Sequence, residues 1–322
     1  TSGDTGAAAI DAIKGKKNVN IFVLHPHNRV SPVQRKLMTT GKEANVFNIA
    51  IDGNFDDCQN LVKSMFADKI FSNEIKMSGV NSINWARIIA QSVYYFYSYY
   101  LVEGDKQPIN FSVPTGNFGD IYAGYLAKKM GLPINKLIVA TNQNDILHRA
   151  ISKGDYEVEK VTETISPSMD IQIASNFERL IYDLNDGDDE KTIIAMQDIK
   201  EKGEYKINQK KLDKIKLNFL SSRMNEEEVL KNIKLVYEKF DIVLDPHSAI
   251  GYGAFDKVNL NGNNIVLATA HPCKFPEAIK NSINLKVDLP DELKFIMDEK
   301  EKYDIIENNV DKVKKHIKDR IQ

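Results

Sequence analysis

The sequence is short of the residues that build disulfides, metal centres and membrane anchors. Among its 322 residues only two are cysteines, Cys58 and Cys273, which lie far apart and match no metal-ligand or redox spacing. We therefore expect two buried free thiols and no metal site. No apolar run reaches the ~20 residues that a membrane-spanning helix needs, and no basic segment followed by an apolar one opens the chain. These absences predict a cytoplasmic protein with no membrane partner.

An excess of charge of one sign is absent as well. The 43 Lys and Arg residues nearly balance the 45 Asp and Glu residues, which gives a formal net charge of −2 at pH 7. This balance predicts no long-range attraction to nucleic acid. Hydrophobic residues make up 42% and charged residues 27% of the chain, an ordinary composition for a folded globular protein. The sequence also lacks internal repeats and a phosphate-binding loop that ends in Lys-Ser or Lys-Thr.

Short apolar runs alternate with segments of helical periodicity along the chain. Buried strands are expected at residues 19–24, 45–51, 111–113, 136–141 and 264–269. Helical patterns follow most of these runs, and such alternation is typical of an α/β fold in which helices cover parallel strands.

Three other segments carry separate expectations. A short strand is expected at residues 242–244, and the aromatic residues at 94–100 are expected to pack in the core. From about residue 153 to 225 the periodicity weakens and the charge rises, which predicts a peripheral insertion.

The most informative stretch is the strand at residues 111–113, which stops at Pro114 and turns through Gly116 and Gly119 into a helical pattern. Such a turn leaves the first N–H groups of the helix without intrahelical partners and points the positive end of the helix dipole outward. Backbone alone can then bind a phosphate group. Since many turns of this kind contain glycine for packing only, the residues themselves leave both interpretations open. Asp120 would repel a phosphate unless it caps the helix or points away.

Hydroxyl-bearing residues open the chain. Thr1, Ser2, Asp4 and Thr5 precede an alanine-rich helical pattern, and Ser2, Asp4 or Thr5 would cap that helix. From the residues alone, a helix cap is the simplest interpretation.

Further along the chain, Asn84 and Arg87 are three residues apart and share one face of a predicted helix. The planar guanidinium of Arg87 suits a phosphate, with a solvated arginine as the alternative. Thr269 ends the strand at 264–269. Ligands of parallel sheets bind beyond the carboxyl ends of the strands, so Thr269 is expected at the same edge as the glycines. His247 has no acidic or nucleophilic partner nearby in the sequence, so we interpret it as structural.

These segments together resemble threonine synthase, a pyridoxal-phosphate enzyme family of fold type II. The sequence Val-Pro-Thr-Gly-Asn-Phe-Gly-Asp at residues 113–120 resembles the loop that holds the cofactor phosphate, and Thr-Ser-Gly-Asp-Thr-Gly at residues 1–6 resembles the segment that faces the substrate. The likeness covers most of the chain and is weak from about residue 153 to 240. It implies the cofactor-phosphate residues Gly116, Asn117, Phe118, Gly119 and Asp120, a hydrogen bond from Thr269 to the pyridine nitrogen, and the substrate residues Thr1, Ser2, Asp4, Thr5, Asn84 and Arg87.

The resemblance also implies an architecture and a reaction. We expect two parallel-sheet α/β domains, a smaller one at residues 1–80 that faces the substrate and a larger one at residues 81–322 that binds pyridoxal 5'-phosphate. The implied reaction converts O-phosphohomoserine and water to threonine and phosphate. The family's cofactor-binding lysine belongs to a Phe-Lys-Asp motif upstream of the Thr-Ser-Gly-Asp-Thr-Gly segment, and no Phe-Lys-Asp occurs here. The chain is therefore expected to be a fragment without a catalytic residue of its own, because Lys274 matches a strand-end motif of the family instead.

Two alternatives remain at this point. One is another fold type II lyase, such as a threonine dehydratase or a phospho-lyase relative, whose glycine loop would usually carry more consecutive glycines. The other is a non-catalytic domain that binds a phosphate compound. The sequence is compatible with a monomer or a homodimer.

Overall fold

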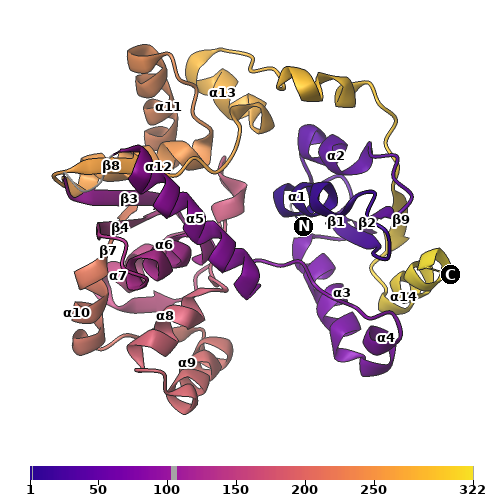
Figure 1. The fold of residues 1–322 in the computed structure, drawn as a ribbon, viewed down its shortest axis with the longest axis horizontal. Helices are drawn as coiled ribbons and strands as arrows, with labels where there is room; N and C mark the ends of the chain where they lie inside the picture. The colour runs from indigo at the N-terminus through magenta and orange to yellow at the C-terminus, as the bar shows by residue number, and fades with distance from the viewer. Residues whose placement is uncertain (2, 103–106, 322) are drawn as a thin grey trace. The chain divides into compact units, whose positions relative to one another are not determined.

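The computed structural model describes residues 1, 3–102 and 107–321, with the side chains of residues 55 and 56 left aside. The chain divides into two compact units, Thr1–Asn81 with Asp288–Gln322, and Ser82–Val287. Figure 1 labels the elements of both units, and each unit is described by itself. None of the described helices combines the length and the apolar character that crossing a membrane requires.

The first unit is built on a parallel sheet of order β1-β2-β9. Its strands are β1 (Ile21–Pro26), β2 (Val46–Asp52) and β9 (Asp304–Glu307). In the register, Ile21 lies opposite Val46, and Ile49 lies opposite Asp304. The helices of this unit are α1 (Asp4–Ile13), α2 (Pro32–Thr39), α3 (Phe55–Ala67), α4 (Lys69–Glu74), the 3-10 helix η3 (Asp291–Met297) and α14 (Val310–Ile321).

The expected division of the chain assigned its C-terminal end to the larger domain. Residues 288–322 instead belong to the first unit. The reason is that β9 adds an edge strand to β2, while Val313 and Ile317 of α14 are buried in the same apolar cluster as Ile49 and Ile51 of β2. The charged C-terminal segment contains no local pattern that would indicate which sheet it joins, so its assignment to the first unit could not be predicted.

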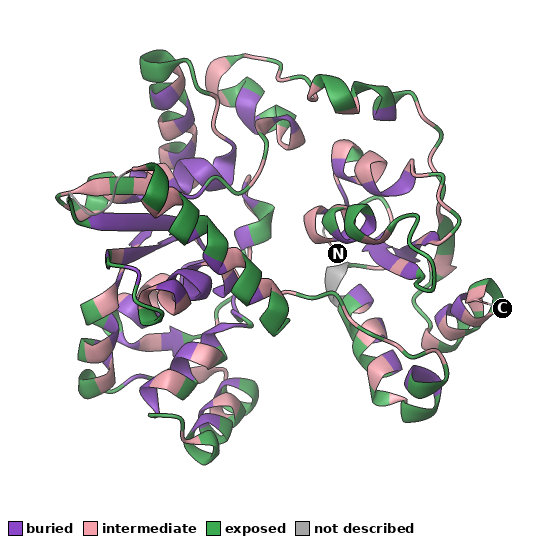
Figure 2. Cartoon of the chain, viewed as in Figure 1, coloured by how far each residue is buried: buried purple, intermediate pink, exposed green. Residues whose placement is uncertain are grey.

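The second unit is built on a four-stranded parallel sheet of order β7-β4-β3-β8. Its strands are β3 (Ile109–Pro114), β4 (Ile134–Thr141), β7 (Phe219–Arg223) and β8 (Asn263–Val266). A small antiparallel pair, β5 (Asp155–Glu157) and β6 (Glu204–Lys206), lies outside this sheet. Every residue of β3 is buried, as Figure 2 shows, and this includes the polar residues Asn110 and Ser112.

Helices cover both faces of the four-stranded sheet. Successive residues of β4 point to opposite sides, so that Leu137 and Val139 join one apolar cluster, and Ile138 and Ala140 join another. The helices of the unit are α5 (Trp85–Leu101), α6 (Gly119–Lys129), α7 (Ile146–Lys153), α8 (Phe177–Leu184), α9 (Asp189–Lys202), α10 (Gln209–Asn218), α11 (Glu226–Phe240), α12 (Pro246–Val258) and α13 (Pro276–Ile283), with the 3-10 turns η1 (Pro167–Met169) and η2 (Pro272–Lys274). The first cluster contains residues of α5 to α10, and the second contains residues of α11, α12 and α13.

Two local expectations were wrong. Residues 242–244 form no strand and lead directly to the start of α12. The aromatic residues at 94–100 lie on α5, but of these only Tyr95 is fully buried, whereas Tyr97 and Tyr100 are 62% and 80% exposed. A helix that packs on one layer buries only one face, so a run that is aromatic at nearly every position must expose most of its rings.

Candidate active site

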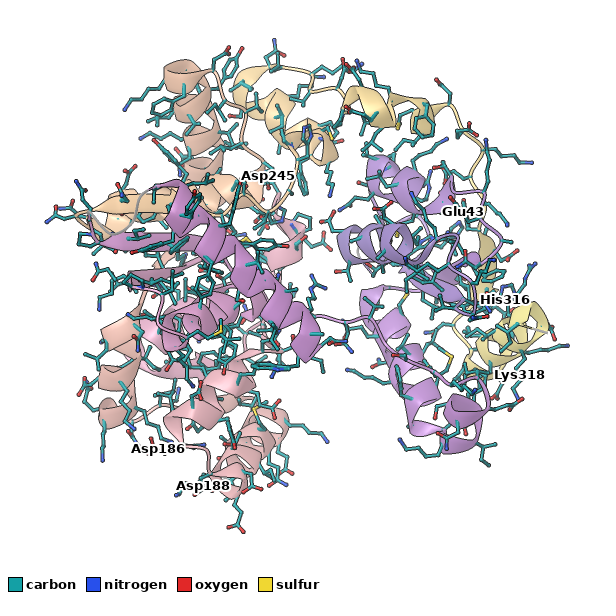
Figure 3. The ribbon with its side chains drawn as sticks, in the orientation of Figure 1. Glu43, Asp186, Asp188, Asp245, His316 and Lys318 are labelled. Carbon is teal, nitrogen blue, oxygen red and sulfur yellow. The ribbon has the colours of Figure 1, made fainter. Side chains whose placement is uncertain are left out.

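The carboxyl ends of β3, β4 and β8 meet at one edge of the sheet because the three strands are parallel. The start of α12 lies at the same edge. Ser112 Oγ of β3 donates to the carbonyl oxygen of Gly251 (2.6 Å), and a Cβ added at Gly251 would meet Val266 Cγ1 at 2.9 Å and Pro114 Cγ at 3.2 Å. Figure 3 labels Asp245, the residue at which this helix begins. The edge therefore brings together a strand-to-helix turn, a strand end and a helix N-terminus.

Residues 116–119, the glycine turn, connect β3 to α6. Phe118 adopts the left-handed conformation (φ 66°, ψ 6°), and its fully buried ring packs against Phe177 and Phe219 with centroid separations of 5.2 and 5.8 Å. A Cβ added at Gly116 would meet the carbonyl oxygen of Ser168 at 2.8 Å, and one added at Gly119 would meet Asn117 Oδ1 at 2.8 Å. Both glycines are therefore required by the close packing of the turn.

The main-chain amides of the glycine turn are open to a ligand. Within the described part of the chain, the amides of residues 116–118, 120 and 121 have no acceptor, and that of Gly119 donates to Asn117 Oδ1 (2.7 Å). Phe118 is the N-cap of α6 and supplies no side-chain cap. Unpartnered amides at the positive end of a helix are the arrangement that binds phosphate, so the turn fits the phosphate of a cofactor such as pyridoxal phosphate.

Asp120 lies in the first turn of α6, next to these amides. Tyr95 Oη donates to the main-chain oxygen of Asp120 (2.8 Å) and approaches its Oδ1 (3.3 Å). Burial raises the pKa of the Asp120 carboxyl to about 6, against the opposing effects of the Tyr95 hydrogen bond and the positive charge of Arg87. A carboxyl with this pKa is readily neutralised when another anion approaches.

The beginning of α5 packs against the glycine turn. A Cβ added at Gly119 would meet Ile88 Cδ1 at 3.3 Å, and the charge of Arg87 acts on Asp120. Asn84 is the N-cap of α5, and its Oδ1 accepts from the Ala86 amide (2.9 Å). The side-chain carbonyl group of Asn84 therefore caps the helix, while Arg87 lies close enough to Asp120 for its charge to lower the pKa of that carboxyl.

The region expected to be a peripheral insertion is only partly peripheral, because residues 164–179 cover the glycine turn. The Asn176 amide donates to the carbonyl of Asn117 (3.0 Å), and Asn176 Nδ2 donates to the carbonyl of Ser82 (3.0 Å) before α5. Asp170 Oδ1 accepts hydrogen bonds from Asn142 Nδ2 (2.8 Å) and Thr164 Oγ1 (2.7 Å), which joins the segment to the loop after β4. These contacts are made by single polar residues far apart in sequence, so periodicity gave no signal for them.

Thr269 follows β8 by three residues, and its side chain is exposed. The Leu267 amide still donates to the Ser112 carbonyl of β3 (3.0 Å), and the Thr269 amide donates to Ser248 Oγ (3.3 Å). Thr269 is thus placed at the edge where β3 enters the glycine turn. Lys274 lies farther along the same connection, in η2.

Sequence reasoning missed the polar network at the start of α12. His247 was interpreted as having no acidic partner, but Asp245 Oδ1 lies 2.9 Å from His247 Nδ1. Asp245 also accepts from Ser248 Oγ, and all three residues are at most 3% exposed. His247 Nε2 is buried and has no hydrogen-bond partner among the described residues. A signal was present in the sequence, because an acidic residue before a proline is a typical N-cap whose carboxylate faces the next residues.

The opening segment belongs to the first unit. Thr1 Oγ1 accepts from the amides of Gly3 (3.1 Å) and Gly6 (3.0 Å), so this hydroxyl holds the start of α1. The N-cap of α1 is Gly3, with no side-chain cap, and not Asp4 or Thr5, two of the three residues expected to cap it. A Cβ on Gly3 would lie 2.7 Å from Gln34 Cβ, and its φ of 130° favours glycine.

Two of the residues expected to contact the substrate lie in the first turn of α1. Asp4 and Thr5 are the first residues of α1, and Ser2 lies outside the described residues. Among the residues that the structure describes, no group of three or more His, Cys, Asp and Glu side chains is placed to hold a metal ion.

Two family models match the chain. The model "Pyridoxal-phosphate dependent enzyme" matches residues 1–204, and "Threonine synthase, C-terminal" matches residues 248–317. Together they include the glycine turn in the first match and Thr269 in the second.

Curated relatives and solved structures agree with these matches. The chain is 46% identical over 317 residues to threonine synthase of Pseudomonas aeruginosa, covering 97% of this chain and 67% of that protein. It is 43% identical over 350 residues to the Saccharomyces cerevisiae enzyme of the same name, covering all of this chain and 68% of the relative. The structure of pyridoxal-phosphate-bound threonine synthase from Brucella melitensis superposes with a TM-score of 0.95 at 47% identity, over 99% of this chain and 69% of that one.

Proposed function

Because the chain belongs to the threonine synthase family of pyridoxal-phosphate enzymes, we propose that it converts O-phosphohomoserine and water to L-threonine and phosphate. The family relation gives the enzyme class, the α/β fold of type II and the cofactor. The choice of substrate and the roles of individual residues are part of the proposal.

The single observation that carries the proposal is the glycine turn with its unpartnered amides at the N-terminus of α6. We assign to Gly116, Asn117 and Phe118 the binding of the cofactor phosphate through their N–H groups, with Asn117 Oδ1 holding Gly119 in place. Thr269 Oγ1 is assigned to the pyridine nitrogen. When bound, pyridoxal phosphate supplies an electron sink that makes the protons next to the amino group of an amino-acid substrate acidic.

Asp120 fits this assignment as a hydrogen-bond donor to the cofactor phosphate. Its pKa of about 6 is already well above the ordinary value near 4 of an aspartate. A phosphate dianion at the neighbouring amides would raise that pKa further, because like charges disfavour ionisation. A neutral Asp120 donates a hydrogen bond to a phosphate oxygen, and the repulsion expected from the sequence disappears.

The substrate has a phosphate of its own, and Arg87 with Asn84 is assigned to it. Arg87 is partly buried at the beginning of α5, and its charge acts on Asp120, the residue after the glycine turn. A guanidinium binds phosphate through two parallel N–H donors, which orients the leaving group as well as binding it. Thr1, Ser2, Asp4 and Thr5 are assigned to the amino-acid end of the substrate, supported by the position of Asp4 and Thr5 in the first turn of α1.

The two units then have different tasks. The unit Ser82–Val287 would bind the cofactor, and the unit that contains Thr1–Asn81 would face the substrate. The upstream cofactor-binding lysine, the monomeric or homodimeric state and the cytoplasmic location stay predictions.

A direct test expresses the protein from its complete reading frame with pyridoxal phosphate and supplies O-phosphohomoserine. The proposal predicts threonine and inorganic phosphate in equal amounts. O-phosphoserine and L-threonine serve as control substrates, because another fold type II lyase would turn one of them over. Deamination of threonine without release of phosphate from O-phosphohomoserine would contradict the proposal, as would binding of O-phosphohomoserine without turnover.

A further inference from the structure

The start of α12 carries a buried hydrogen-bond network whose role is separate from that of the glycine turn. Asp245 is its centre. The Oδ1 atom of Asp245 lies 2.9 Å from both the amide nitrogen and Nδ1 of His247, and its Oδ2 accepts from the hydroxyl and the amide of Ser248. Asp245 and Ser248 are each 1% exposed. A buried carboxylate with this many donors has its orientation fixed.

The direction of the hydrogen bonds makes Ser248 a link to Thr269. A serine hydroxyl has one proton to donate and two lone pairs to accept with. Since the proton of Ser248 is donated to Asp245, a lone pair of Oγ is left for the Thr269 amide, which approaches at 3.3 Å. In the described structure, this amide is the one main-chain donor of residues 268–271 that has an acceptor. Ser248 therefore fixes a segment that has already left the sheet.

The helix that carries Ser248 is itself fixed to the strands of the site. Ser112 Oγ of β3 donates to the Gly251 carbonyl (2.6 Å), and Gly251 lies so close to Pro114 and Val266 that a methyl group there would collide with Val266. Pro114 is the last residue of β3 before the glycine turn, and Val266 is the last residue of β8 before Thr269. The position of Ser248 is thus set by the same two strands that lead to the two proposed cofactor contacts.

We propose that Ser248, oriented by Asp245, is a positioning residue that sets the main chain of Thr269 so that the threonine hydroxyl meets the ring nitrogen of the cofactor. The inference rests on the proposed role of Thr269. Ser248 touches neither cofactor nor substrate in this account and acts only through Thr269. The simpler view, in which Ser248 merely stabilises the first turn of α12, predicts a loss of stability and no change at the cofactor.

The test compares four variants of the holoenzyme expressed from its complete reading frame: Ser248→Ala, Ser248→Cys, Thr269→Ala and Ser282→Ala. Ser248→Cys keeps the size of the side chain but is a weak hydrogen-bond acceptor, and it serves if Ser248→Ala does not fold. Ser282 is the matched control, because its hydroxyl also donates to an oxygen of the protein, the Leu230 carbonyl at 2.7 Å, away from Asp245. The readouts are the absorbance spectrum of the bound cofactor, the Kd for pyridoxal phosphate and the melting temperature.

The proposal predicts that Ser248→Ala and Ser248→Cys shift the absorbance spectrum in the same direction as Thr269→Ala and raise the Kd by about five- to tenfold, the effect of one lost hydrogen bond. Ser282→Ala should leave both unchanged. Combining Ser248→Ala with Thr269→Ala should add nothing to the spectral shift, since the first residue acts through the second.

Two results would overturn the inference, and they are distinguishable. If Thr269→Ala changes the spectrum while both Ser248 variants lower only the melting temperature, the positioning role is wrong and the role of Thr269 stands. If Thr269→Ala itself leaves the spectrum and Kd unchanged, the proposed function of Thr269 is wrong, and the inference falls with it.

Discussion

The Asn176 amide donates to the carbonyl of Asn117 at 3.0 Å, so a residue from the middle of the chain holds the glycine turn from outside. Asn176 is fully buried, its Nδ2 donates to Ser82, and its Oδ1 accepts from Arg179 Nε (3.1 Å). Asn176 therefore connects the segment 164–179, the beginning of α5 and the turn that we propose for the cofactor phosphate, through its main-chain amide and its side chain together.

Replacing Asn176 should affect both stability and cofactor binding. Asn176→Ala leaves the Ser82 carbonyl and Arg179 Nε without their partners, which should lower the free energy of unfolding by ~1–3 kcal/mol in urea denaturation. It should also raise the Kd for pyridoxal phosphate, because the main-chain amide that donates to Asn117 remains but is no longer held in place by the side-chain bonds to Ser82 and Arg179. The control Asn208→Ala removes the N-cap of α10 and should cost ~1 kcal/mol without changing the Kd. Equal Kd values for the two variants would contradict this role of the covering segment.

The raised pKa of Asp120 predicts that the stability of the protein depends on pH. Its folded-state pKa of about 6 lies above that of an unfolded aspartate, so the folded apoprotein holds this proton more tightly. The contribution is fully present below about pH 4 and is lost as the pH rises through about 6. Asp120→Asn, which cannot ionise, should therefore gain stability relative to the wild type by ~1–3 kcal/mol between pH 4 and pH 7.

The measurement for Asp120 is urea unfolding of the apoprotein at several pH values. Asp256→Asn is the control, because Asp256 is an exposed residue of α12. A stability difference between Asp120→Asn and the wild type that stays constant from pH 4 to pH 7 would show that Asp120 does not titrate in this range.

The proposed contact between Arg87 and the substrate phosphate predicts that replacing Arg87 weakens substrate binding. Arg87→Ala should raise the KM for O-phosphohomoserine about tenfold or more, since a charge-assisted contact to phosphate is lost. Arg320→Ala is the matched control, because Arg320 makes an exposed ion pair with Asp304 (2.9 Å). Steady-state kinetics measures the KM of both variants. An unchanged KM in Arg87→Ala would show that Arg87 does not bind the substrate phosphate.

Local sequence signals predicted the sheet strands and the turn that follows β3. The buried runs at residues 19–24, 45–51 and 136–141 correspond to β1, β2 and β4, and the glycines with Pro114 predicted the entry into α6. These signals are local, because a buried strand is rich in apolar residues and a tight turn needs glycine.

The errors concern contacts between distant residues. Nothing near Asn176 in the sequence indicates that it would bind Asn117, and nothing in the charged C-terminal segment indicates that β9 would pair with β2. The network of Asp245, His247 and Ser248 is local and could have been found, since Asp-Pro is a common helix start.

The most direct test of the central claim compares pyridoxal phosphate with pyridoxal, which lacks the phosphate, as ligands of the wild type and of Gly116→Ala. The added methyl would meet the Ser168 carbonyl at 2.8 Å and so displace the amides of the glycine turn. Gly41→Ala is the control, because its methyl would meet the end of the Glu43 side chain and, among the described residues, no backbone atom. If the glycine turn binds the cofactor phosphate, Gly116→Ala should weaken the binding of pyridoxal phosphate about tenfold or more and leave the binding of pyridoxal nearly unchanged. An equal loss for both ligands would contradict it, because the turn would then hold no phosphate.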